Sequence, residues 1–244
     1  MGPRTLWAPW APWALWDLVR GKNASDARRP IGEIPFTVLD TELTGLDERR
    51  DDIVSIGALH MRGGLIQLGG TFQELVKPSA VLDGRTVVVH RITPSQLEAM
   101  PPIDRVLGPF LDYLAGTVLV GHCISLDLAF LNRDARRLAR APLRNRAVDT
   151  LSLYGWLRRR GPDHPAFSIA TLAPSLFDLA SAFEIPVEAA HTAIGDAYVT
   201  AQVFQRLLPF LDRVGVGDLA ALCRVGDPRR QAAHLTASDS HPHF

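Results

Sequence analysis

The sequence predicts an α/β fold in which a mixed β-sheet is flanked by helices. Two β-rich stretches, 53–61 and 65–76, come first, and Arg62-Gly63-Gly64 lies between them where a hairpin needs its turn. Short apolar strands then alternate with helical patterns over the rest of the chain. A hairpin followed by strand–helix alternation indicates one sheet with both antiparallel and parallel strands, covered by helices.

Each further element has its own local signal. The Gly69-Gly70 pair within the second β-rich stretch indicates a bulge. Residues 79–95 are rich in turn formers, and 159–174 form a proline-containing loop. The remaining expected elements are strands at 36–40, 117–121 and 147–149, and helices at 103–115, 127–139, 150–158, 175–184 and 192–213.

One folded domain with a tail at each end is expected from a chain of 244 residues. Residues 1–35 form a Trp-rich appendage followed by a polar linker, and the domain spans 36–213. Residues 214–244 form a C-terminal extension. We expect this extension to be largely disordered after about residue 225, where the chain becomes polar.

The composition argues against several classes of protein. Basic and acidic residues number 26 each, so the chain lacks the basic excess of a protein that coats nucleic acid. No run of 18 apolar residues occurs, which argues against a transmembrane helix. The two cysteines, Cys123 and Cys223, form neither a disulfide framework nor a metal-ligand cluster, and a reducing, cytoplasmic location is expected.

Three segments carry acidic side chains in patterns that suit chemistry. The first, Asp40-Thr41-Glu42, ends the first strand, and two acids one residue apart on a strand project from the same face. Their charges repel unless a cation lies between them. Taken alone, the pattern is also that of an ordinary strand that ends in a polar turn.

The other two segments lie at helix starts. Asp127 follows Gly121-His122, and at such a position an Asp also stabilises the helix N-terminus through backbone N–H groups. His191 and Asp196 are five residues apart, which corresponds to about 140° of rotation on a regular helix. Their side chains converge only if His191 precedes the helix and Asp196 lies in its second turn.

Together, and in this order, the three segments resemble the DEDDh 3′→5′ exonucleases. That family includes the proofreading epsilon subunit of bacterial replicative DNA polymerase and, more distantly, RNase T and oligoribonuclease. The resemblance runs from Phe36 to Leu211 and includes the motifs LDTELTGLD, VHRIT, VLVGH, VDTLSL and HTAIGDAYVTA. A related subfamily has a catalytic Tyr where this chain has Thr192, so the histidine type fits better.

The resemblance implies a ribonuclease H-like fold and two divalent metal ions. Carboxylate oxygens suit Mg²⁺ or Mn²⁺ better than Zn²⁺. By resemblance, Asp40 bridges both ions and Asp127 holds one of them. Glu42 and Asp196 complete the site of the attacking water, and His191 accepts the proton of that water.

The resemblance also implies contacts to the terminal nucleotide. The residues expected there are Thr41, Leu43, Thr44 and His90. The chain departs from the family pattern at Leu43, Cys123 and Leu126, where the family has Thr, Asn and Phe. None of these changes removes a metal ligand, so we expect activity to survive. A cysteine cannot replace the donors and acceptor of an amide, so the rate or the substrate preference is expected to change.

The expected partner is a nucleic-acid 3′ end, with single-stranded or frayed DNA favoured over RNA. An RNA-trimming exonuclease and a non-catalytic nucleic-acid or polymerase-binding protein of the same fold remain open alternatives. The Gln205–Phe210 hexapeptide has the spacing of a sliding-clamp docking motif, although its leucines are also needed in the core.

The N-terminal appendage carries a stripe of tryptophans at every third position. An apolar stripe of this kind needs cover, which indicates packing on the domain, self-association or a polymerase partner. A membrane surface fits less well, because the flanking positive charge is sparse. The residues of the stripe are Trp7, Trp10, Trp13 and Trp16.

Overall fold

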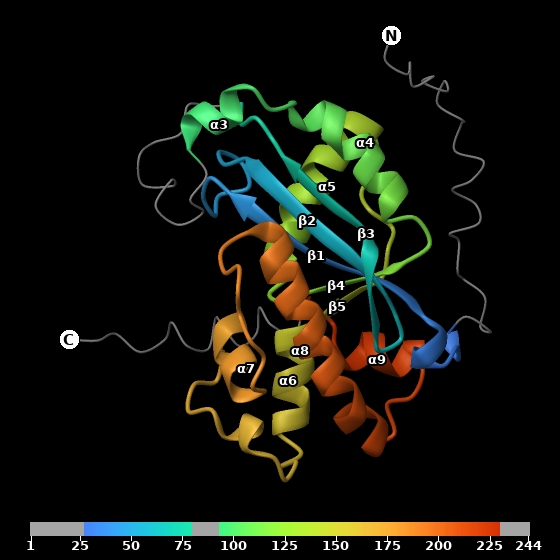
Figure 1. Ribbon diagram of the computed structural model, residues 1–244. Helices are drawn as coiled ribbons and strands as arrows, with labels where there is room; N and C mark the ends of the chain where they lie inside the picture. Colours follow the sequence, from blue (N-terminus) through green and yellow to red (C-terminus); the bar gives the residue numbers. More distant parts are fainter. Residues whose placement is uncertain (1–26, 80–92, 230–244) are drawn as a thin grey trace.

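The computed structural model describes residues 27–79 and 93–229, and it contains the predicted mixed sheet (Figure 1). The five strands lie in the order β3-β2-β1-β4-β5. The pairs β1–β2 and β2–β3 are antiparallel, whereas β1–β4 and β4–β5 are parallel. The strands are β1 Pro35–Leu43, β2 Ile53–Arg62, β3 Leu65–Leu75, β4 Val118–Gly121 and β5 Ala147–Asp149.

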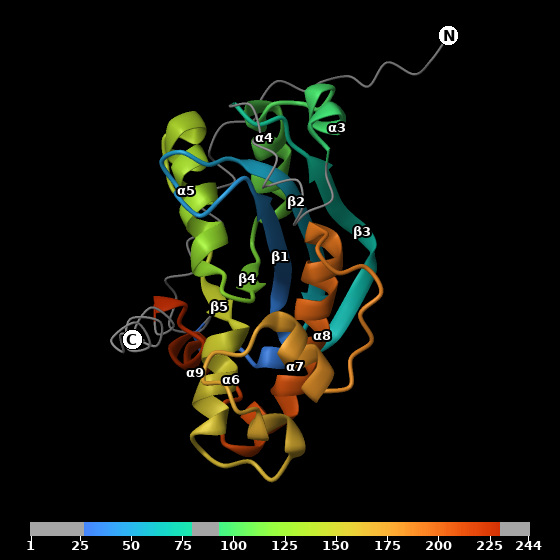
Figure 2. The same ribbon diagram turned by 90° about the vertical axis from the view of Figure 1, so that its left-hand side faces the viewer.

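Helices cover both faces of this sheet. Figure 2 shows α5 and α8 on either side of β1. The helical elements are η2 Ile31–Glu33, α3 Pro94–Glu98, α4 Ile103–Tyr113, α5 Ser125–Ala139, α6 Thr150–Arg158, η3 Pro165–Ser168, α7 Leu176–Ala182, α8 Ala193–Arg213 and α9 Leu219–Val225.

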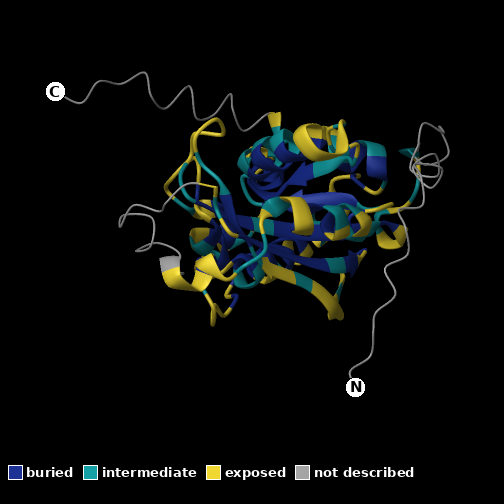
Figure 3. Ribbon diagram, turned by 90° about the horizontal axis from the view of Figure 1, so that it is seen from above, coloured by how far each residue is buried: buried dark blue, intermediate teal, exposed yellow. Residues whose placement is uncertain are grey.

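Strand β1 separates two hydrophobic cores. Its side chains alternate, so Phe36 and Val38 belong to the core beneath α6 and α8, while Leu39 belongs to the core beneath α4 and α5. Strands β1, β2, β4 and β5 and the inner faces of the helices are buried, whereas the edge strand β3 and the outer faces of the helices are mostly exposed (Figure 3). This alternation assigns Asp40 and Glu42 to the face covered by α8 and Thr41 to the face covered by α5.

Most predicted elements are confirmed to within about two residues. Strand β1 is the main difference, because it continues to Leu43 and therefore contains Asp40 and Glu42 within its length. Four short helical elements of the described residues were not predicted, namely η2, α3, η3 and α9. A capping box of Thr93 and Gln96 begins α3. A register shift of β3 opposite Ala58 and His60 confirms the bulge at Gly69-Gly70.

The packed unit extends beyond the predicted limits of 36–213. On the N-terminal side, Ile34 is buried and the Ile31 N–H donates to the Gly217 carbonyl at 3.0 Å. On the C-terminal side, α9 buries Leu222 and Val225 in the core beneath α8. The segments 31–34 and 219–225 are short and largely apolar, and both pack against this core.

Three further features of the sequence can be compared with the structure: the hexapeptide 205–210, the segments outside the described residues, and the hydropathy of the helices. In the hexapeptide 205–210, the Gln205 amide donates to the Gly64 carbonyl at 2.6 Å and Leu207 is buried, so the motif serves internal packing. His90 and the Trp-rich stripe lie outside the described residues. Within the described ranges, no helix is both long and apolar enough to span a bilayer.

Candidate active site

Three carboxylates meet where β1 passes the start of α8. Ligand oxygens of Asp40, Glu42 and Asp196 all lie within 4.8 Å of one another. Glu42 and Asp196 are buried, and Asp40 is half-buried. Carboxylates held this close repel in a partly desolvated environment, so the arrangement suits a divalent cation.

The close approach of α8 to the sheet depends on Gly57. This residue lies opposite Asp40 in the β1–β2 register. A Cβ added at Gly57 would lie 2.2 Å from backbone atoms of Ala193 and Ile194, the first two residues of α8. The absence of a side chain therefore lets α8 begin directly on β2, which places Asp196 beside Asp40. In the sequence, Gly57 has no signal beyond its place in a strand.

A tight turn holds His191 outside the helix, as the spacing predicted. The Thr192 hydroxyl accepts from the Gly195 N–H at 3.2 Å and donates to the Ala189 carbonyl at 3.0 Å. His191 has a φ of 63°, the left-handed conformation that reverses the chain at this point. Asp196 is the fourth residue of α8, slightly nearer its start than predicted.

The turn connects His191 to Asp196 and to α7. The backbone N–H of His191 donates to Asp196 Oδ1 at 3.2 Å. The imidazole is exposed and packs edge-on against Phe177 of α7, with 5.1 Å between the ring centroids. Phe177 was not recognised in the sequence, because an aromatic residue on an amphipathic helix has the ordinary appearance of core packing.

The fourth carboxylate, Asp127, approaches β1 from α5. Its Oδ1 accepts hydrogen bonds from the backbone N–H of Thr41 at 2.9 Å and from the Thr41 hydroxyl at 2.6 Å. Helix α5 begins two residues earlier than predicted, with Ile124 as its N-cap residue and no capping side chain. The carboxylate of Asp127 thus points to β1, which argues against a purely helix-capping role.

Asp127 interacts electrostatically with Asp40, as Glu42 and Asp196 do. Burial raises the pKa of Asp40 well above its ordinary value, and the charges of Asp127, Asp196 and Glu42 raise it further. Burial also raises the pKa of Asp127 to about 7, against the opposing effect of the hydrogen bond from the Thr41 hydroxyl. The other three predicted acids therefore all act on Asp40.

Asp149 supports the loop that leads to Asp127. Its side chain is fully buried and accepts from the N–H groups of Ile124 at 3.0 Å and Ser152 at 2.7 Å. Burial raises the pKa of Asp149 to about 6, although these hydrogen bonds oppose the rise. An Asp between a short strand and a helix is a capping signal in the sequence. Its second bond, to the loop before α5, has no local signature.

His122 is a structural histidine in this loop. Its Nδ1 lies 2.9 Å from the hydroxyl of Thr150. Burial lowers the pKa of His122 to about 4, while the Pro174 carbonyl and Asp178 oppose this decrease. The imidazole is therefore neutral at pH 7 and is held in the loop by Thr150, whereas His191 is exposed.

The predicted substrate-contacting side chains have other partners in this structure. The hydroxyl of Thr41 is bonded to Asp127, and Leu43 is buried in the core beneath α5. The Thr44 hydroxyl donates to Asp51 and accepts from the Asp52 N–H. Any substrate contact made by these three residues would therefore fall mainly to their backbone groups, and it stays a prediction.

The sequence of this chain is similar to that of known proteins. Residues 37–204 match the family described as Exonuclease, of the RNase T type. The chain belongs to this exonuclease family. It is 29% identical over 191 residues to the DNA polymerase III subunit epsilon of Aquifex aeolicus, a match that covers 78% of this chain and 89% of that protein.

Other members of the exonuclease family are longer than this chain. A DNA polymerase III subunit epsilon-like protein of Rhodobacter capsulatus is 34% identical over 84% of this chain, but the match spans only 28% of that protein. E. coli exonuclease I in complex with a dT13 oligonucleotide superposes with a TM-score of 0.64 at 18% identity, over 75% of this chain and 42% of the other. This structural likeness confirms the ribonuclease H-like fold.

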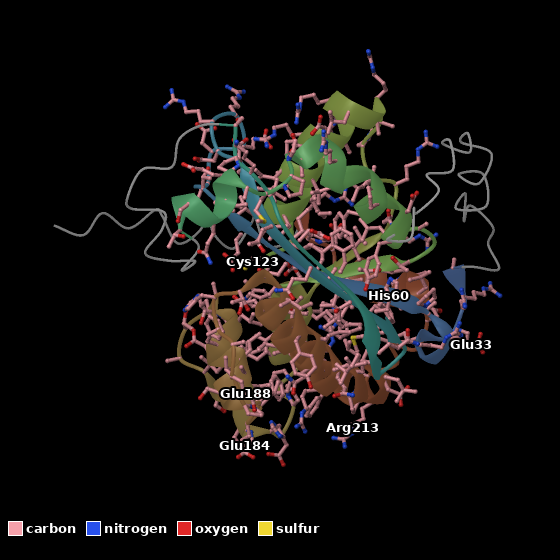
Figure 4. All side chains as sticks on the ribbon, turned by 45° about the horizontal axis from the view of Figure 1, so that its top comes forward. Glu33, His60, Cys123, Glu184, Glu188 and Arg213 are labelled. Carbon is pink, nitrogen blue, oxygen red and sulfur yellow. The ribbon has the colours of Figure 1, made fainter. Side chains whose placement is uncertain are left out.

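The Asn-to-Cys departure from the exonuclease pattern has a conformational consequence. Cys123, labelled in Figure 4, has a φ of 58°. Asn adopts this left-handed conformation more readily than most other residues with a side chain. We expect Cys123→Asn to stabilise the protein by about 0.5–1 kcal/mol, and to leave nucleotide release equal or faster.

Thermal unfolding and nucleotide release of Cys123→Asn, with Cys123→Ala as control, test this expectation. Alanine removes the sulfur without relieving the backbone, so the control should gain no stability. A lower melting temperature or a loss of activity in Cys123→Asn would show that the sulfur has a specific role.

Proposed function

We propose that this chain is a two-metal-ion 3′→5′ exonuclease that acts on single-stranded or frayed DNA ends. The observation that carries the proposal is the meeting of Asp40, Glu42 and Asp196 within 4.8 Å, with Asp127 of α5 hydrogen-bonded to Thr41, the residue between two of these acids. Burial and the charges of the other three acids raise the pKa of Asp40, so a cation among these carboxylates would relieve their repulsion.

The residues present fit divalent cations with hard oxygen ligands. Asp40, between the other acids, would bridge the two ions. Glu42 and Asp196 would complete one ion site and Asp127 the other, directly or through water. Bound Mg²⁺ or Mn²⁺ would supply an activated water and stabilise the leaving oxygen of the phosphodiester.

His191 would take the proton from the attacking water. This residue is exposed, and the hydrogen bond from its backbone N–H to Asp196 keeps it next to the acidic cluster. The turn 189–195 fixes where the ring leaves the backbone, and Phe177 limits its rotation. General-base groups typically contribute about 10²–10⁴-fold to a rate.

We therefore expect His191→Ala to lose about 10²–10⁴-fold in the rate of nucleotide release while it still binds Mn²⁺. Mn²⁺ binding can be measured by calorimetry and the rate by release of a labelled terminal nucleotide. His164→Ala is a suitable control, because His164 is the N-cap residue of η3 and its ring packs against Phe183 and Phe210. If His191→Ala weakened Mn²⁺ binding as much as Asp196→Asn does, His191 would be a ligand instead.

The proposed preference of this chain for DNA is based on the names of similar proteins. The names of several refer to DNA polymerase III, and exonuclease I was solved with a DNA oligonucleotide. Association with a polymerase and a cytoplasmic location are part of the same proposal. The Trp-rich stripe offers no support for such a partner, because it lies outside the described residues.

Incubation with DNA and RNA oligonucleotides of matched sequence tests the substrate class. Each is labelled at its 3′ end and incubated with Mg²⁺, Mn²⁺ or EDTA. We expect faster release from DNA. Faster release from RNA would make this chain an RNA-trimming exonuclease, and no release from either would favour a non-catalytic binding protein.

A further inference from the structure

Thr41 lies between Asp40 and Glu42 in strand β1, but its side chain is not part of their cluster. Successive side chains of a strand point to opposite faces, so Thr41 is directed away from Asp40 and Glu42. It lies on the face covered by α5, together with Leu39 and Leu43. Thr41 therefore cannot join the Asp40–Glu42–Asp196 cluster as a further ligand.

The side chain of Asp127 accepts a hydrogen bond from β1 at a position where a neighbouring strand would otherwise pair. The parallel pairing of β4 with β1 ends at Val38 and Val120. Three residues further along β1, the N–H of Thr41 donates to Asp127 Oδ1 instead of to a strand carbonyl. The side chain of Asp127 thus continues the edge of the sheet, next to Asp40.

The hydroxyl of Thr41 makes the second bond to the same oxygen. Its Oγ1 donates to Asp127 Oδ1 at 2.6 Å, and both side chains are buried. Two donors on Oδ1 fix the rotation of the carboxylate and leave Oδ2 as the oxygen available to a cation or its water. The backbone N–H alone would leave the carboxylate freer to rotate.

We propose that Thr41 is a positioning residue, which orients Asp127 toward the acidic cluster through its hydroxyl. This inference rests on the proposed role of Asp127 as a metal ligand. Partners that orient ligands in this way are typically worth about 10–100-fold in metal affinity or activity. The residue between the two acids then has a function beyond strand formation.

Two substitutions separate the hydroxyl from the packing of Thr41. Thr41→Val keeps the shape and the backbone N–H, whereas Thr41→Ser keeps the hydroxyl. Thr37→Val is a matched control on the same strand and the same face, because the buried Thr37 hydroxyl is bonded to Thr117 at 2.8 Å. Mn²⁺ affinity by calorimetry, the Mg²⁺ dependence of nucleotide release and the melting temperature are measured for each.

We expect Thr41→Val to weaken Mn²⁺ binding or to raise the Mg²⁺ requirement by about 10–100-fold. Thr41→Ser should restore most of this loss, and Thr37→Val should leave both quantities unchanged. Wild-type Mn²⁺ affinity and Mg²⁺ dependence in a folded Thr41→Val variant would overturn the inference. A wild-type protein that binds Mn²⁺ but releases no nucleotide would contradict the proposed function alone, since the Mn²⁺ measurement still tests Thr41.

Discussion

Asp40→Asn should abolish nucleotide release and yet raise the melting temperature of the metal-free protein. The loss of a shared ligand removes several kcal/mol of transition-state stabilisation, which corresponds to a rate decrease on the order of 10³-fold or more. The gain in stability follows from relief of repulsion, because Asp127, Asp196 and Glu42 all raise the pKa of Asp40. Each 1 kcal/mol gained would raise the melting temperature by about 2–4 °C.

The pH dependence of stability provides an internal check on Asp40→Asn. The pKa values of Asp40 and Asp127 are raised in the folded protein, so the folded state binds more protons than the unfolded state. The metal-free wild type should therefore lose stability as the pH rises from about 4 to about 7. The variant should show a shallower decrease, and saturating Mg²⁺ should flatten it for the wild type.

Asp163→Asn, which changes an exposed loop aspartate, is the control for these measurements. It should retain the activity of the wild type and its pH dependence of unfolding. Near-wild-type nucleotide release by a folded Asp40→Asn variant would contradict the proposed mechanism. A lower metal-free melting temperature would contradict the view that the acids repel one another.

Gly57→Ala should damage both folding and catalysis. The added Cβ would lie 2.2 Å from the backbone of Ala193 and Ile194, so α8 must move away from β2. Overpacking of this kind typically costs about 1–3 kcal/mol of stability. A displacement of about 1 Å in a catalytic group can cost about 10²-fold in rate, and Asp196 would move with α8.

Gly69→Ala provides a matched control for Gly57→Ala. Both glycines lie in strands, but a Cβ at Gly69 would meet nothing within 4 Å. Melting temperature, Mn²⁺ affinity and the rate of nucleotide release should fall in Gly57→Ala and stay close to wild type in Gly69→Ala. Equal behaviour of the two variants would show that the contact with β2 does not position α8.

Most elements, and the segments that bring three acids together, could be predicted from the sequence because their signals are local. Alternating strand patterns, helical spacing and the positions of Asp40, Glu42 and Asp196 can all be read within short segments. The requirement that His191 precede its helix followed from rotation per residue alone. The structure agrees, with Thr192 capping α8 directly after His191.

What the sequence did not predict depends on contacts between distant segments. Gly57 matters because α8 lies on it, and the role of Thr41 depends on Asp127, which is 86 residues away. Helix α9 was also not predicted, because it completes a core whose other members come from earlier in the chain. A short apolar segment does not indicate, from its sequence alone, which distant part of the chain it packs against.

The release of the 3′-terminal nucleotide is the most direct test of the whole account. A single-stranded DNA oligonucleotide carrying different labels at its two ends is incubated with the full chain and Mg²⁺, and the products are resolved by length. We predict that the 3′ label appears first as a mononucleotide, that EDTA stops its release, and that Asp40→Asn releases none. Early release of the 5′ label, internal cleavage products, or undiminished release in EDTA would contradict the assignment of a metal-dependent 3′→5′ exonuclease.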